Sequence, residues 1–258
     1  MQDSPTFLDK KTKALVALLL TFTAGIVDIV GYITVYHYFV AHMTGTTVHL
    51  GNKLVRSEWG DVAKSGIIIL SFVAGSVVGR AIIEAGARAG RRKVASITLL
   101  AEAFLVLSFV VIRHTALGQA PPQEFRLATT CALLGVLAAA MGLQTATLTR
   151  IGPLTIHTTF VTGMLNKFAQ SVSQWIFWLH DHWAKRFSIA AATRPVGFRN
   201  ALFMAAIWIS YLVGSIAGTI MNSRWSVAAL YVPVFILVFS AGIDHIQPLS
   251  VEEESEQV

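Results

Sequence analysis

The chain has 258 residues, of which 54% are hydrophobic and only 13% are charged, with a formal net charge of +6. Soluble domains carry roughly 25% charged residues, so this composition, with its apolar residues in long blocks, predicts a polytopic α-helical membrane protein. The single cysteine, Cys131, excludes a disulfide framework within one chain.

Six apolar runs have the roughly 17–25 residues that a helix needs to cross a hydrocarbon core of about 30 Å. The first follows three lysines but is longer than the apolar core of a signal peptide, about 7–15 residues, so we interpret it as a retained helix. In chain order the runs are about Ala14–Tyr36, Ser65–Ala85, Val94–Ile112, Leu127–Leu148, Ala201–Met221 and Trp225–Ile243.

The basic residues predict how these helices are oriented. If the N-terminus is cytoplasmic, 14 of the 20 Lys and Arg residues fall in cytoplasmic segments and 6 in external ones. By the positive-inside rule, both termini are therefore expected in the cytoplasm of a bacterial cell, with the chain in the inner membrane. Because the same rule explains the net positive charge, the expected partner is the lipid bilayer and not nucleic acid.

The sequence contains an internal repeat. Ala24–Asp28 resembles Met141–Thr145, and Phe72–Gly79 resembles Tyr211–Gly218. A Thr-Gly pair, Thr44-Gly45 in one copy and Thr162-Gly163 in the other, follows a long apolar run each time. Three spans per copy is an odd number, so the two copies must be inverted relative to each other, as in many secondary transporters. We expect a cytoplasmic segment at 1–13, repeats at 14–112 and 127–243, a basic cytoplasmic loop at about 180–199 and an acidic disordered tail at 244–258.

An ordered set of motifs resembles the YoaK-like family of bacterial membrane proteins, a family of unknown function. The resemblance covers roughly Leu15 to Ile243 and implies an integral membrane protein without implying an activity. The chain departs from the family pattern at Thr46 and Thr145, where asparagine is typical. The motifs that carry it are Gly25-x-x-Asp28-x-x-x-Tyr32, Phe39-Val-Ala-His42-Met-Thr-Gly-Thr46, Met141-Gly-Leu-Gln144 and Thr158-Thr159-x-x-Thr162-Gly163.

Asp28 is the most informative single residue, because a charge in the middle of a membrane helix costs about 2.5–3.5 kcal/mol on insertion scales. Thr21, Gly25, Asp28 and Tyr32 share one face of the first helix. Two interpretations stay open: a structural hydrogen bond to a helix end or hydroxyl, and a proton or cation site.

The Thr-Gly pairs also have two interpretations. Thr44 and Thr162 could cap the segments that follow, with glycine easing a turn. Alternatively, each pair begins a broken helix whose free N–H groups face a cavity near the bilayer midplane. The candidate substrate- or ion-binding residues are Asp28, Tyr32, His42, Thr44, Gly45, Thr46, Gln144, Thr158, Thr159, Thr162 and Gly163.

The leading hypothesis from the sequence is a secondary transporter or channel for a small polar or ionic solute. The alternative is a membrane scaffold or sensor that transports nothing. An enzyme is not expected, because no nucleophile–base pair or metal-binding motif is evident, and no metal or cofactor is expected either. A homo-oligomer is compatible with the sequence.

Overall fold

The computed structural model describes residues 7–35, 37–91, 93–115, 125–147, 150–151, 154–155, 158–182, 193 and 195–249. Helices dominate it, as the composition predicts. The elements in chain order are α1 (Phe7–Thr34), α2 (Met43–Val55), α3 (Trp59–Arg88), α4 (Ala95–Thr115), α5 (Leu127–Thr147), β1 (Arg150–Ile151), β2 (Leu154–Thr155), α6 (Val161–His182), α8 (Val196–Trp225), the 3-10 helix η3 (Ser226–Leu230) and α9 (Tyr231–Ile246).

Five stretches of the described chain are long and apolar enough to cross a membrane. They are α1 from Lys11, then α3, α4 and α5, and finally a continuous stretch from Val196 to Ile246. That last stretch holds two helices, because Ser226, with φ of 51°, separates α8 from η3 and α9. Each apolar run expected from the sequence thus overlaps a helix.

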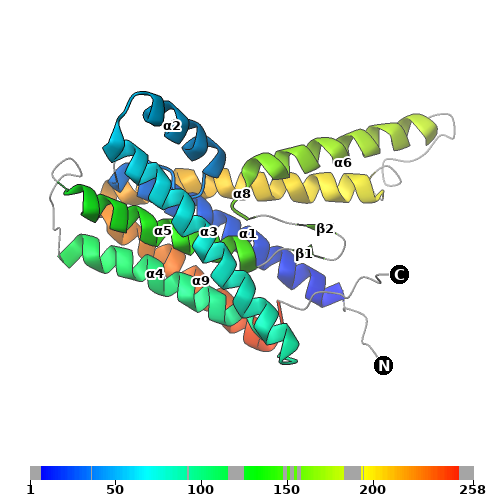
Figure 1. Ribbon diagram of the computed structural model, residues 1–258. Coiled ribbons are helices and arrows are strands. Elements are labelled where there is room, and N and C mark those ends of the chain that lie inside the picture. Colours follow the sequence, from blue (N-terminus) through cyan, green and yellow to red (C-terminus); the bar gives the residue numbers. More distant parts are fainter. Residues whose placement is uncertain are drawn as a thin grey trace.

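Two further helices, α2 and α6, are not among these stretches. Both begin near the middle of the molecule and run toward opposite ends of it (Figure 1). The 13 residues of α2 extend only about 20 Å at 1.5 Å per residue, too short to cross a bilayer.

The Thr-Gly pairs do not form the turns expected from the sequence. Thr44-Gly45 and Thr162-Gly163 lie within the first turns of α2 and α6. The capping position of α2 is His42, which makes no capping hydrogen bond with its side chain. The described residues just before each helix, 40–42 and 158–160, are not helical, so the pairs mark where the helices begin.

The long helices pack in matching pairs. Helix α1 packs on α8 as α3 packs on α5, and α2 lies on α3 as α6 lies on α8, while α4 contacts α9. Glycines permit the first two contacts: a Cβ on Gly25 would collide with the Tyr211 carbonyl oxygen, and one on Gly142 with that of Phe72. Small residues at these positions let helix backbones approach closely, as is typical inside membranes.

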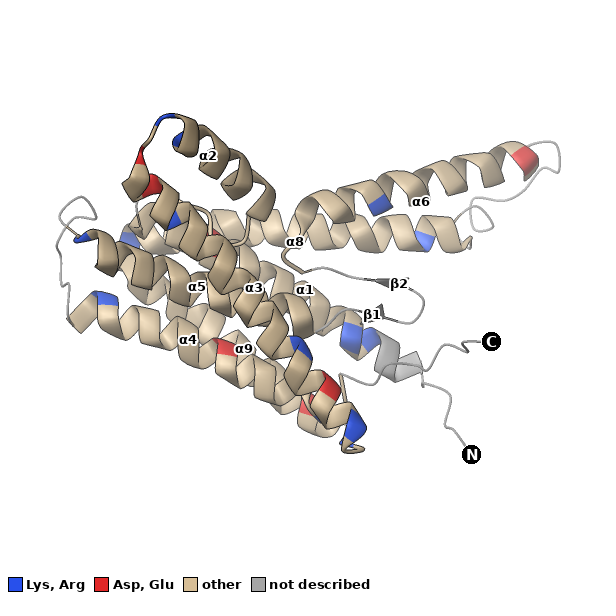
Figure 2. Cartoon of the chain, in the orientation of Figure 1, with Lys and Arg blue, Asp and Glu red and all other residues tan. Residues whose placement is uncertain are grey.

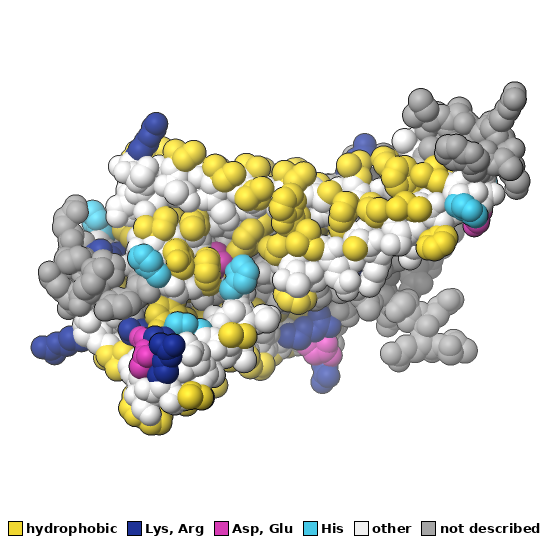
Figure 3. Space-filling view, turned by 90° about the horizontal axis from the view of Figure 1, so that it is seen from above, with side chains coloured by type: hydrophobic (Ala, Val, Ile, Leu, Met, Phe, Trp, Pro, Cys, Tyr) yellow, Lys and Arg dark blue, Asp and Glu magenta, His cyan; other side chains and the backbone are white. Residues whose placement is uncertain are grey.

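The outer surface is that of a membrane protein. Apolar side chains gather in a broad band over the face seen in Figure 3, and Lys and Arg lie mostly toward the ends of the helices (Figure 2). Exposed apolar residues of this size and number suit contact with lipid. On α3 and α8 they include Leu70, Val73, Val77, Ile209, Leu212 and Ile216.

The ends of the chain differ in detail from the boundaries expected. Helix α1 begins at Phe7, inside the expected N-terminal segment, and α9 continues to Ile246, with Asp244 and Leu249 buried. The two-residue strands β1 and β2 form an antiparallel ladder that the sequence did not predict. Residues 250–258 of the expected tail and most of 183–194 of the basic loop lie outside the described residues.

Candidate functional site

Asp28 joins three parts of the fold. Its side chain is 2% exposed, and its Oδ1 accepts hydrogen bonds from the backbone N–H groups of Val40 (2.9 Å) and Ala41 (3.0 Å). Its Oδ2 accepts one from the Tyr211 hydroxyl of α8 at 2.7 Å and lies 3.4 Å from His42 Nδ1. We call this set of contacts the Asp28 anchor. It fixes the extended segment before α2 to both α1 and α8.

Both of its oxygens are occupied, which explains how the carboxylate is tolerated in the interior. Hydrogen bonds to an ionised acceptor are stronger than neutral ones, and they replace the water that burial removes. The hydrogen bond to Asp28 raises the pKa of His42 above its ordinary value, against the opposing effect of burial. Asp28 thus shifts the protonation equilibrium of His42 toward its charged form, at a position where its side chain is 49% exposed.

A second set of contacts fixes the segment before α6 to α5. Gln144 Nε2 donates to the Thr158 hydroxyl (3.2 Å) and to the carbonyl oxygen of Leu20 on α1 (2.7 Å). One residue further along α5, the hydroxyls of Thr145 and Thr159 are 2.5 Å apart. We call this set the threonine anchor. Gln144 and Thr158 are buried, so these contacts lie in the interior.

The two anchors occupy matching places in the two halves of the chain. Asp28 stands three residues after Gly25, and Thr145 three residues after Gly142, whose contacts with α8 and α3 match. Asp28 holds the segment that precedes α2, and Thr145 holds the segment that precedes α6. The first half uses a carboxylate and backbone N–H groups, whereas the second uses an amide and hydroxyls.

The structure brings together some of the site residues expected from the sequence and separates others. Asp28 and His42 meet, as do Gln144 and Thr158, with Thr159 next to them. Tyr32 does not contact Asp28 and instead stacks on Phe39, with 4.4 Å between ring centroids.

The remaining candidates lie on the first turns of α2 and α6. Thr44, Gly45 and Thr162 are exposed, and Gly163 is half-buried. Thr46 is buried but donates its hydroxyl to the His42 carbonyl oxygen of its own helix (3.0 Å). These residues therefore lie at the beginnings of α2 and α6, and none of them forms a hydrogen bond with Asp28.

The sequence analysis did not identify Tyr211, whose hydroxyl is the closest side-chain partner of Asp28. A signal was present, because Tyr211 opens the repeated Gly-Ser-x-x-Gly segment, and its counterpart Phe72 lacks the hydroxyl. The backbone donors Val40 and Ala41 leave no trace in residue type, so only the fold reveals them.

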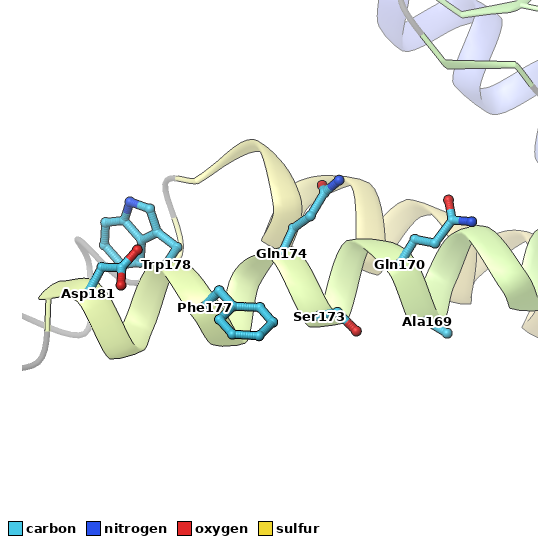
Figure 4. Close-up of a pocket in the computed structure, with 7 residues that line it drawn as sticks. All are labelled: Ala169, Gln170, Ser173, Gln174, Phe177, Trp178 and Asp181. Atoms are coloured by element: carbon cyan, nitrogen blue, oxygen red, sulfur yellow. The ribbon is translucent and has the colours of Figure 1, made fainter.

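A hollow on the outside of α6 is separate from both anchors. It is lined by Ala169, Gln170, Ser173, Gln174, Phe177, Trp178 and Asp181, all from this one helix. Figure 4 shows these side chains projecting to both sides of α6. Within the described residues, no three His, Cys, Asp or Glu side chains are grouped closely enough to hold a metal ion.

Long apolar helices, a lipid-compatible surface and interior polar anchors define a polytopic α-helical membrane protein. The family described as "Protein of unknown function (DUF1275)" matches residues 16–243, and the chain belongs to this family. The chain is also 26% identical over 222 residues to the "UPF0700 transmembrane protein YoaK" of Bacillus subtilis (strain 168), covering 86% of this chain and 88% of the relative. No solved structure matches the chain.

Proposed function

We propose that the chain is a secondary transporter or channel for a small polar or ionic solute. In this proposal six crossings form two inverted repeats in the bacterial inner membrane, with both termini in the cytoplasm. Helices α1, α3 and α4 with α2 make the first repeat, and α5, α8 and α9 with α6 make the second. The solute passes near the beginnings of α2 and α6.

The packing of the helices supports the inverted repeat. In the proposed repeat α1 corresponds to α5, α2 to α6, α3 to α8 and α4 to α9. The contact between α1 and α8 then corresponds to the one between α5 and α3, and the contact between α2 and α3 to the one between α6 and α8. The contact between α4 and α9 corresponds to itself. The hydrogen bonds follow the same exchange: Ser215 Oγ donates to the Gly25 carbonyl oxygen at 3.4 Å, and Ser76 Oγ to that of Gly142 at 3.2 Å. Such a correspondence is expected when an internal duplication is inverted across a membrane.

The observation that carries the transport proposal is the placement of α2 and α6. Both helices begin near the middle of the molecule and run toward opposite ends of it (Figure 1). The first turn of any helix has backbone N–H groups without intrahelical partners and a partial positive charge. Two such ends, each with threonine and glycine in its first turn, offer donors to a polar solute, as broken helices do in inverted-repeat transporters.

The test is an uptake measurement on purified protein in liposomes. Small ions and metabolites are first screened by thermal shift, and solutes that stabilise the protein are then followed as flux. Gly45 and Gly60 give a matched pair, because a Cβ at either would meet no atom within 4 Å. We expect Gly45→Phe, in the first turn of α2, to block the flux and Gly60→Phe, in the first turn of α3, to leave it unchanged. Equal flux through both variants would contradict the proposed path.

A scaffold or sensor that transports nothing is the second candidate. It is favoured by the Asp28 anchor, since both oxygens of Asp28 are occupied by partners of the protein itself. In this alternative the anchor only ties the segment before α2 to the bundle.

Asp28→Asn separates the two candidates. The variant keeps the shape of the side chain and an oxygen acceptor but removes the charge. If Asp28 takes part in gradient-driven flux, the variant should purify and melt like the parent and lose that flux. If Asp28 is only structural, the variant should melt earlier, and any surviving flux should keep its pH dependence.

A further inference from the structure

Glu102 is unlike the other buried acids of the fold. It lies in α4 with 0% exposure, and neither carboxylate oxygen has a hydrogen-bond partner among the described residues. Asp28 has the partners given above, and Asp244 accepts from the backbone N–H groups of Ser96 and Leu249, both at 2.8 Å. An ionised carboxylate without partners in an apolar interior is strongly unfavourable, so the neutral acid is the stable form of Glu102.

Another buried oxygen without a partner lies at the level of Glu102 in the bundle. Helices α4 and α5 run antiparallel (Figure 1), and a 2.9 Å hydrogen bond from Thr147 to the Thr98 hydroxyl sets their register. Glu102 follows Thr98 by four residues and Gln144 precedes Thr147 by three, so the two lie at the same level of the bundle. Gln144 Oε1 is buried and also lacks a partner.

A further buried oxygen without a partner lies on α1. Gln144 donates to the Leu20 carbonyl oxygen, and Thr23, one turn further along α1, has a buried hydroxyl without a partner. A neutral carboxyl group has one O–H to donate, whereas an amide oxygen and a hydroxyl oxygen both accept. Gln144 Oε1 and Thr23 Oγ1 can therefore accept a hydrogen bond, but neither is hydrogen-bonded to Glu102 in this structure, and no described cation is paired with Glu102.

Charged and titratable groups on the elements around Glu102 lie elsewhere. The 3-10 helix η3 has none, and Asp244 of α9 is held at Ser96, six residues or about 9 Å before Glu102 along α4. None of the other groups forms a hydrogen bond or salt bridge with Glu102. They are Arg113 and His114 on α4, Cys131 on α5, Tyr231 and His245 on α9, Lys11, Lys13, Asp28 and Tyr32 on α1, and Asp61, Lys64, Arg80, Glu84 and Arg88 on α3.

We propose that Glu102 is a proton-binding site in the membrane core, at which a neutral carboxyl group releases and regains its proton during the working cycle. Gln144, at the same level of the bundle, holds Thr158 just before α6 through its amide nitrogen. Movement of that segment would free the amide and change what Glu102 faces. This inference rests on the proposed transport function and makes the proton its coupling ion.

Infrared difference spectroscopy on the full-length protein in liposomes tests the protonation directly. We expect a carbonyl band of a protonated carboxyl group that is lost in Glu102→Gln, kept at a shifted frequency in Glu102→Asp, and unchanged in Glu84→Gln. Glu84 is the control because it is a half-exposed carboxylate paired with Arg88. The band should also lose intensity as the pH is raised over the range in which the protein stays folded.

Several outcomes would overturn the inference. A wild-type protein without a band due to Glu102 would mean an ionised side chain. A band that never responds to pH would mean a permanently protonated structural acid. Loss of the band on adding sodium at constant pH would identify a metal-cation site instead of a proton site.

Flux measurements keep this failure distinct from failure of the proposed function. One result would contradict the proton site and leave the transport proposal intact. In that result a solute is transported, a pH gradient does not drive the transport, and Glu102→Gln does not alter the flux. If Glu102 titrates but no solute moves in the uptake screen, the transport proposal falls, and the coupling inferred here falls with it.

Discussion

The Asp28 anchor and the threonine anchor do the same mechanical task with different chemistry. Each holds the non-helical segment before α2 or α6 against a long helix. The first concentrates four contacts on one buried carboxylate, whereas the second spreads its contacts over an amide and three hydroxyls. The difference is that only the first half places an acidic side chain at this point.

This asymmetry has an energetic consequence. Removing a carboxylate that satisfies several buried donors leaves all of them unpaired, whereas removing one hydroxyl leaves at most a single group unpaired. The first half should therefore be sensitive at one residue, and the second half should tolerate single changes. The predictions below are ordered by the size of the expected effect.

The largest expected effect is that of Asp28→Ala. It strands the N–H groups of Val40 and Ala41 and the hydroxyl of Tyr211, at roughly 1–3 kcal/mol for each unsatisfied buried group, so we expect a loss of about 3 kcal/mol or more. Thr145→Val at the matching position should cost about 1 kcal/mol. Chemical or thermal unfolding in detergent measures both. Equal losses would remove the proposed difference between the anchors.

Glycine substitutions test a feature that the two halves have in common. The helix contacts at Gly25 and Gly142 are alike, whereas the two anchors differ. Gly25→Ala and Gly142→Ala each push a Cβ into the backbone of the facing helix, and overpacking of this kind typically costs about 1–3 kcal/mol. We expect similar losses of unfolding free energy for the two. Gly45→Ala is the control, since its Cβ would meet open space. A large cost for only one of the pair would argue against equivalent packing.

Tyr211→Phe makes position 211 identical to its counterpart, Phe72, and removes one hydrogen bond from Asp28. We expect a loss of about 1 kcal/mol, in line with a single hydrogen bond to a partner that keeps others. Thermal unfolding of the purified protein gives the value. A variant as damaging as Asp28→Ala would mean that the hydroxyl alone holds the anchor together.

The smallest expected effect is a pH dependence from His42. Because Asp28 raises the pKa of His42, the interaction stabilises the fold fully below the ordinary histidine pKa of about 6.5, and this stabilisation is lost as pH rises through the raised value. The half-exposed ring keeps the effect small. As pH rises from about 6.5, the melting temperature should decline less steeply in His42→Gln than in the parent. Identical profiles would exclude a contribution from His42.

The sequence predicts the helices well because apolar block length is a direct physical requirement of the bilayer. It also predicts a repeat, and two of the matched residues, Gly25 and Gly142, lie where helix backbones approach closely. It cannot reveal that Thr44-Gly45 and Thr162-Gly163 begin helices instead of forming turns, because threonine and glycine are common in both settings.

The site was harder to predict than the fold. Asp28 stands out in the sequence because a buried charge needs partners, yet two of those partners are backbone N–H groups set by the path of the extended segment. Tyr32 shares a helical face with Asp28, but stacking on Phe39 directs it elsewhere. A shared helical face therefore limits which residues can meet without deciding which ones do.

The most direct test of the central claim asks whether α2 and α6 enter the membrane from opposite sides. Single cysteines in a Cys131→Ala background, at Arg56 after α2, at Gly90 between α3 and α4, and at His180 near the end of α6, are labelled in intact cells and in inverted vesicles with an impermeant maleimide. We predict that position 56 labels only from outside, and positions 90 and 180 only from the cytoplasmic side. Labelling of positions 56 and 180 from the same side would contradict the inverted arrangement.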